Sequence, residues 1–134
     1  MALERAARAG ERQRLDEALD FFASAAKRHH ADEEASLFPR LRSDATLAPL
    51  LETLASEHRA HDEARGEIEG MIRADASGEA VVARVEAFVT MVRAHVERED
   101  RELLPAAERA LDADARAAVA EEMRGRRGGG QRRG

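Results

Sequence analysis

Apolar residues recur along the chain at alternating steps of three and four, the spacing that places side chains on one face of an α-helix. The pattern predicts three long helices, over residues 11–38, 46–74 and 78–104. Pro39 and Pro105 are expected to end the first and the third, and Thr46 and Ser77 to cap the second and third at their N-termini. Because the connections are short, the long helices should pack antiparallel.

Two shorter segments flank the long helices. Residues 2–9 resemble the last two turns of an earlier helix, and a short polar helix is expected at about 112–124. The predicted fold is therefore all-α, an up-down antiparallel helical bundle of three long helices with a truncated N-terminal helix and a short C-terminal one. We expect the bundle to occupy residues 1–110, with the short helix and a disordered Arg/Gly-rich tail in 111–134.

Each of the three apolar stripes contains histidine, and two of them contain glutamate one turn later. The first stripe is Leu15, Leu19, Phe22, Ala26, His29, Glu33 and Leu37. The second is Leu47, Leu51, Leu54, His58, His61, Arg65, Ile68 and Ile72. The third is Val81, Val85, Phe88, Val92, His95, Glu99 and Leu103. Burying an unpaired carboxylate is costly, so three such helices together indicate one shared polar centre.

The two adjacent histidines and the two adjacent glutamates of "RHHADEEASLFPRL" fall on different faces of the predicted helix. His29 and Glu33 continue the apolar stripe, so we expect them to point inward. His30 and Glu34 fall on a row of polar residues and are expected at the surface, which makes them the less favoured candidates for metal ligands.

An internal repeat strengthens the case for a metal site. "HHADEEASLFP" and "HVEREDRELLP" both contain the pattern H-x-x-x-E-x-x-x-L-[FL]-P, with His29 corresponding to His95 and Glu33 to Glu99. Side chains four residues apart share a helical face, so each pair can reach one metal centre. Two such pairs and histidine from a third helix can hold two ions, and imidazole with carboxylate suits iron, manganese or zinc.

Composition removes several other functions. The chain has no Cys, which excludes disulfides, thiolate ligands and cysteine nucleophiles. No apolar run approaches a membrane span and no secretory signal opens the chain, so a soluble, cytoplasmic protein is expected. Five arginines follow the last acidic residue, Glu122, although the net charge is −5. Nucleic acid is not an expected partner, apart from weak contact through this basic tail.

The segments "HHADEEASLFP", "SEHRAHDE" and "HVEREDRELLP", in this order, resemble the hemerythrin-like domain, also called the HHE cation-binding domain, over about residues 2–110. The resemblance implies a four-helix bundle with a non-haem di-iron centre bridged by two carboxylates. Carried over by position, the ligands it implies are His29, Glu33, His58, His95 and Glu99. Asp100 competes with Glu99, and His61 is the substitute for a second third-helix histidine, because Asp62 occupies the usual position.

The sequence also departs from the family. Members have a histidine ligand on the first helix, and here no histidine precedes His29. One ligand and much of one wall of the bundle are therefore expected to be missing, which leaves an open groove lined by Leu15, Phe22, Leu54, Phe88 and Val92. A misassigned start, a homodimer that supplies the wall, or a mononuclear, zinc-bound or empty centre would each account for this.

The function expected from the resemblance is a non-haem metal-binding protein, with iron as cofactor, that binds or senses oxygen, nitric oxide or iron. Mononuclear iron, zinc and manganese remain alternatives to di-iron. The competing interpretation is a metal-free helical module whose open groove binds a partner or a second copy. Catalysis is not the expected role, although weak oxidase or peroxidase activity is a further alternative.

Overall fold

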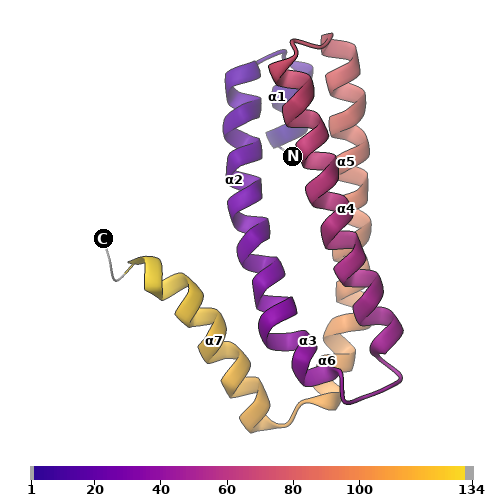
Figure 1. Cartoon of the computed structure of the whole chain (residues 1–134), viewed down its shortest axis with the longest axis vertical. Helices are drawn as coiled ribbons and strands as arrows, with labels where there is room; N and C mark the ends of the chain where they lie inside the picture. Colours follow the sequence, from indigo (N-terminus) through magenta and orange to yellow (C-terminus); the bar gives the residue numbers. More distant parts are fainter. Residues whose placement is uncertain (1, 132–134) are drawn as a thin grey trace. The chain divides into compact units, whose positions relative to one another are not determined.

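The computed structural model describes residues 2–131, and side chains as far as residue 128. The described residues are helical apart from short turns and contain no strand, which confirms the all-α prediction (Figure 1). The α-helices are α1 (Ala2–Arg8), α2 (Arg12–Ala31), α3 (Phe38–Leu41), α4 (Ala48–Arg73), α5 (Gly78–Arg98), α6 (Leu104–Ala110) and α7 (Ala113–Gln131). Two π-helical segments, η1 (Asp32–Leu37) and η2 (Glu99–Leu103), continue α2 and α5. Among the described helices, none is both long enough and apolar enough to cross a membrane.

The chain divides into two compact units, each with its own core. The first combines Met1–Ala25 with Ser56–Glu97, and the second combines Ala26–Ala55 with Arg98–Gly134. The long helices α2, α4 and α5 each contribute to both units, so the division falls within helices rather than in loops.

The first unit has a core in which α1 packs against the long helices. Leu3, Ala6 and Ala7 of α1 are buried in one cluster with Leu15 and Phe88. The chain turns back after α1 at Gly10, whose φ of 68° lies in the left-handed region that favours glycine. The two alanines allow close approach of the helices, so even a two-turn helix buries this face.

The expected open groove is therefore wrong for this unit. Leu15 and Phe88 are 2% and 1% exposed, and Phe22 and Val92 pack against the same cluster. Phe22 and Phe88 also meet edge to face, with ring centroids 5.0 Å apart. Leu54, the remaining residue of the predicted groove, is fully buried in the other core. The competing groove-binding interpretation thus loses the surface on which it depended.

The second unit buries a separate apolar cluster at the ends of the π-segments. It contains Leu37, Phe38, Leu41, Leu51, Leu54, Leu103, Ala107, Leu111 and Val119. Val119 belongs to α7, and Ala115 and Met123 of the same helix pack at the edge of the cluster. This helix therefore completes the core of the second unit.

The prolines do not end the helices, contrary to the sequence prediction. Pro39 and Pro105 lie in the first turn of α3 and α6, directly after η1 and η2. Proline lacks an N–H and its ring clashes with the carbonyl four residues earlier, so a wider turn before it relieves the clash. In both places the widened turn is closed by a five-residue backbone bond, from Phe38 N–H to the Glu33 carbonyl and from Leu104 N–H to the Glu99 carbonyl.

The C-terminal helix is longer than the sequence indicated. A short helix at about 112–124 and a disordered tail were expected, whereas α7 extends to Gln131. Asp112 caps it by accepting a hydrogen bond from Ala115 N–H at 2.8 Å. The helix is held by its packing against η1, which outweighs the poor helix propensity of its glycines. Residues 132–134 of the predicted tail lie outside the described residues.

Of the two predicted helix caps, one is confirmed. Ser77 Oγ accepts a hydrogen bond from Ala80 N–H at 3.2 Å, as an N-cap of α5 should. Thr46 instead donates its hydroxyl to Asp44 at 2.6 Å, and α4 begins two residues later, at Ala48.

Candidate metal centre

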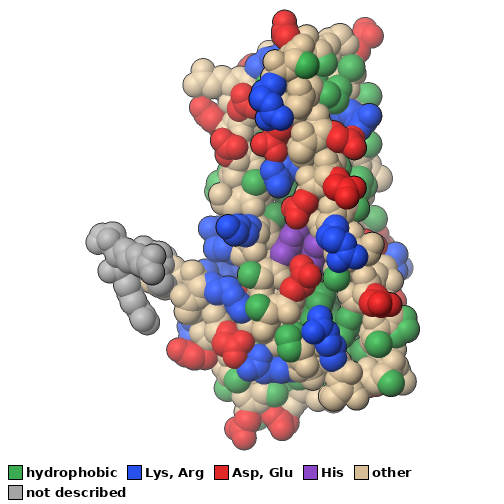
Figure 2. All heavy atoms as spheres, viewed as in Figure 1, with side chains coloured by type: hydrophobic (Ala, Val, Ile, Leu, Met, Phe, Trp, Pro, Cys, Tyr) green, Lys and Arg blue, Asp and Glu red, His purple; other side chains and the backbone are tan. Residues whose placement is uncertain are grey.

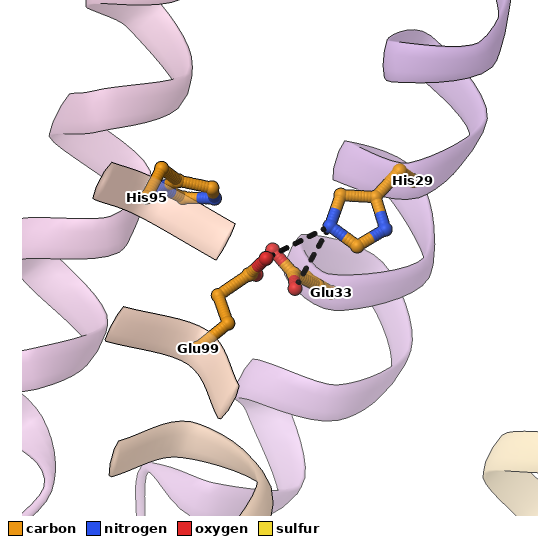
Figure 3. Close-up of side chains that lie close together, drawn as sticks. All are labelled: His29, Glu33, His95 and Glu99. Carbon is orange, nitrogen blue, oxygen red and sulfur yellow. Dashed lines mark hydrogen bonds and ion pairs between the residues drawn. The ribbon is translucent and has the colours of Figure 1, made fainter. Parts of the chain in front are cut away.

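Three of the predicted ligands meet in the second unit. His29 Nε2 lies 3.2 Å from Glu33 Oε2 and 3.2 Å from Glu99 Oε1 (Figure 3). Glu33 is one turn beyond His29, and Glu99 comes from the other copy of the repeated motif. One imidazole nitrogen thus bridges the two carboxylates, which keeps two negative side chains close together.

His95 joins this group because α5 runs without interruption into η2, where Glu99 follows one helical turn later. His29, Glu33, His95 and Glu99 each offer a ligand atom, and these atoms all lie within 4.8 Å of one another (Figure 3). We call these four residues the His/Glu cluster. Its members are the two corresponding pairs of the sequence repeat, so both copies of the motif contribute to one cluster.

The His/Glu cluster is buried on one side and open on the other. The side chains of Glu33, Glu99 and His95 are 6%, 8% and 4% exposed, whereas that of His29 is 51% exposed. Histidine side chains are accordingly visible at the molecular surface in Figure 2. A hydrogen bond to Glu33 raises the pKa of His29 above its ordinary value, with further attraction from the charges of Glu33 and Asp32; burial and Arg127 oppose this.

A group of three histidines, contributed by the second and third stripes, lies in the first unit. The rings of His58 and His61 each lie 4.9 Å, centroid to centroid, from the ring of His95. His58 and His61 are 2% and 5% exposed. Burial, assisted by the neighbouring His95 and His58, lowers the pKa of His61, which favours the neutral form with a lone pair to donate.

Glu57 contacts the second nitrogen of His95. Its Oε1 lies 2.8 Å from His95 Nδ1, so that nitrogen donates a hydrogen bond to the carboxylate. A carboxylate partner on one nitrogen fixes the tautomer and leaves Nε2 as the donor of a lone pair. Sequence reasoning missed Glu57, because a single glutamate beside a stripe position gives no periodic signal.

Of the other candidate ligands predicted from the sequence, some are exposed and one is buried. Glu34 and Asp100 are exposed, and His30 is half-buried rather than exposed as expected. None of the three belongs to the His/Glu cluster. Asp62 is also at the surface, 3.7 Å from Arg65, while His61 occupies the buried face. His61, and not Asp62, is therefore the buried side chain that lies beside His58 and His95.

Asp32 is a second buried acid that the sequence analysis did not single out. It is 3% exposed and is held by Arg126 at 3.0 Å and by Arg127 at 2.6 Å. Asp32 directly precedes Glu33, but it faces α7 rather than the His/Glu cluster. A pattern could have revealed it, since Asp32, Ser36 and Arg40 follow one another at steps of four residues.

The His/Glu cluster fits a divalent cation. Two imidazoles and two carboxylates suit iron, zinc or manganese, and three of the four side chains are shielded from water. Carboxylates buried this closely need a positive charge, which His29 supplies when it is protonated and a metal ion would supply in its place.

An all-α protein that gathers paired His and Glu residues from a repeated helical motif belongs structurally with the helical cation-binding proteins. Comparison with protein families then identifies it: the model of the hemerythrin HHE cation binding domain matches residues 1–107. The chain therefore belongs to the hemerythrin family, and the resemblance noted in the sequence is confirmed. No curated protein and no solved structure matches it significantly. The family match ends before α7.

Proposed function

We propose that the chain is a non-haem iron protein, with a di-iron centre that binds or senses oxygen or nitric oxide. The observation that carries this proposal is the His/Glu cluster, in which both copies of the repeated motif contribute their histidine and glutamate. Membership of a cation-binding family agrees with it. The donor set contains no thiolate, because the chain has no Cys.

Each proposed ligand has a distinct role. Glu33 and Glu99 would hold the iron through their carboxylates, because one oxygen of each already lies 3.2 Å from His29 Nε2. His29 and His95 would bind as imidazoles from the same two motifs. His58, with His61 in place of Asp62, would complete the set from α4 through their contacts with His95.

The residues around the ligands would orient them and control access. Glu57 holds the Nδ1 proton of His95, which directs Nε2 away from this hydrogen bond. Phe88 lies beside His61, with ring centroids 6.4 Å apart, and shields the histidines from bulk water. The bound iron would supply a coordination position for a diatomic ligand, and the half-exposed His29 marks the side from which such a ligand would enter.

Anaerobic reconstitution with ferrous iron, followed by exposure to oxygen or nitric oxide, tests the proposal. The chain has neither Tyr nor Trp, so near-ultraviolet and visible bands of an iron centre would appear on an almost empty background. We expect iron-dependent absorption that changes on adding either gas. The matched control is the Glu34→Gln variant, which changes an exposed neighbour and should behave as wild type, whereas Glu33→Gln should lose the bands. Spectra that do not respond to either gas would contradict the sensing role.

A further inference from the structure

Helix α7 contacts a polar row on η1 and α3, in addition to packing through its apolar face. The row consists of Asp32, Ser36 and Arg40, at steps of four residues. Arg126 binds Asp32 at 3.0 Å and Ser36 Oγ at 2.6 Å, and Arg127 binds Asp32 at 2.6 Å. Four residues before Arg126, Glu122 accepts hydrogen bonds from Arg40 at 2.6 and 3.2 Å. We call these contacts the α7 clasp.

The order of the contacts shows that the α7 clasp is a matched pair of helical rows. Arg40 contacts Glu122. Ser36 and Asp32, one and two turns before Arg40, contact Arg126, which lies one turn after Glu122. The two helical segments therefore run antiparallel with complementary charges at matching steps. On the same helix, Val119 is part of the apolar cluster of the second unit and Met123 packs against it.

The clasp acts on the segment that holds a proposed metal ligand. Glu33 lies between Asp32 and Ser36 in η1, and its backbone carbonyl closes the widened π-turn. A π-turn is less regular than an α-helical turn and is often found at functional sites, so an external hold on it fixes where its side chains point. Asp32 is buried and bound by two arginines, which leaves η1 little freedom to rotate.

We propose that Arg126 and Arg127 are positioning residues for the metal centre, acting through Asp32 on Glu33. This inference rests on the proposed function and adds to it an element beyond residues 1–107. The second π-segment, η2, contains Glu99 but has no equivalent row. The positions that correspond to Asp32, Ser36 and Arg40 are occupied by Arg98, Glu102 and Ala106. The clasp would therefore set the geometry of one half of a repeated site.

The test compares two readouts in the full chain. Hydrogen exchange of the metal-free protein reports whether α7 holds η1, and competition with a chelator reports the affinity for ferrous iron. The variant is Arg126→Ala with Arg127→Ala. The matched control is Arg124→Ala, which removes an arginine from the same helix whose partner, Glu121, is exposed and also lies on α7.

We expect the double variant to exchange the amides of residues 32–38 at least tenfold faster and to bind ferrous iron about 10–100-fold more weakly, the usual effect of losing a group that orients a ligand. Arg124→Ala should change neither. If the double variant fails to fold by circular dichroism, Asp32→Asn, which keeps the shape of the side chain and removes its charge, should give the same two changes to a smaller extent.

The outcomes separate the two proposals. Faster exchange with unchanged iron affinity would show that α7 only stabilises the fold, and unchanged exchange would show that the clasp does not hold η1; either overturns the inference. Wild-type protein that binds no iron would overturn the proposed function and this inference with it, while the exchange data alone would still show whether the clasp exists.

Discussion

The two adjacent histidines of α2 differ in what they contact. His29 contacts both carboxylates of the His/Glu cluster, whereas His30 does not belong to the cluster. The ring centroids of His29 and His30 lie 6.3 Å apart. The difference follows from helical geometry, since neighbouring residues point about 100° apart. Of these two neighbouring histidines, only His29 is therefore a proposed metal ligand.

The His29→Ala variant should bind ferrous iron at least about tenfold more weakly than wild type, because it removes a donor that contacts both carboxylates. His30→Ala serves as the matched control and should bind within about twofold of wild type. Titration with ferrous iron under anaerobic conditions gives both affinities. A larger loss for His30→Ala would mean that α2 is rotated relative to the arrangement described here.

Glu122 provides a prediction about pH. Hydrogen bonds from Arg40 and Ser36 lower the pKa of Glu122 from 4.5 to about 2. Because the pKa is lower in the folded state, the ionised side chain contributes stability above about pH 4.5, and this contribution is lost as the pH falls towards 2. Glu122→Gln should therefore be less stable than wild type at pH 7, and the difference should shrink in acid.

Chemical denaturation of wild type and Glu122→Gln at several pH values between 2 and 7 measures this difference in the free energy of unfolding. The side chain of Glu122 is 42% exposed, so we expect a small effect. A difference that stays constant over the whole range would show that the Arg40–Glu122 ion pair has no part in it.

At the scale of the elements, the π-segments are the feature that repeats most closely. Both begin at or next to a glutamate of the His/Glu cluster and both precede a proline. The repeat H-x-x-x-E-x-x-x-L-[FL]-P therefore specifies a π-helical turn as well as the histidine and glutamate of each pair. Pro39 and Pro105 are compatible with a continuing helix because the turn before each is already widened.

The turn between α1 and α2 depends on Gly10. Its φ of 68° costs alanine about 1–2 kcal/mol, so Gly10→Ala should lower the free energy of unfolding by about 1 kcal/mol. Gly66, within α4, has open space around the position of a Cβ. Gly66→Ala should raise the free energy of unfolding by about 0.5–1 kcal/mol, because alanine favours the helix.

Denaturant unfolding of the two glycine variants beside wild type tests the turn, since the same substitution should have opposite signs at the two positions. Stabilisation by Gly10→Ala would show that α1 does not turn back onto the core as described. The comparison matters for function because α1 covers the apolar face around Phe88, next to His61.

For the whole molecule, the sequence was most informative where a period of 3.6 residues governs burial. The stripes predicted buried positions on all three long helices, and the repeat brought His29, Glu33, His95 and Glu99 together. Within η1 the stripe correctly predicted that Glu33 and Leu37 are buried, but Asp32 and Ser36, which lie off the stripe, are buried as well.

The ends of the chain were predicted less well, because tertiary packing overrides local composition there. The short segment 2–9 predicts that one wall of the bundle is missing, but two alanines let α1 approach closely and cover the core. The Arg/Gly-rich composition of the C-terminal segment indicated disorder, whereas Arg126 and Arg127 find a buried acid on η1. Asp32, Ser36 and Arg40 follow one another at steps of four, but nothing near them in the sequence identifies Arg126 and Arg127 as their partners.

The iron content of the protein after anaerobic reconstitution and removal of unbound metal decides whether the His/Glu cluster is a metal centre. We expect about two irons per chain for wild type, as a di-iron centre requires. We expect a near-complete loss of iron for the combined variant His29→Ala, Glu33→Gln, His95→Ala and Glu99→Gln, with its helical circular dichroism retained. Iron near zero in wild type, or equal in both proteins, would contradict a metal centre built on the His/Glu cluster.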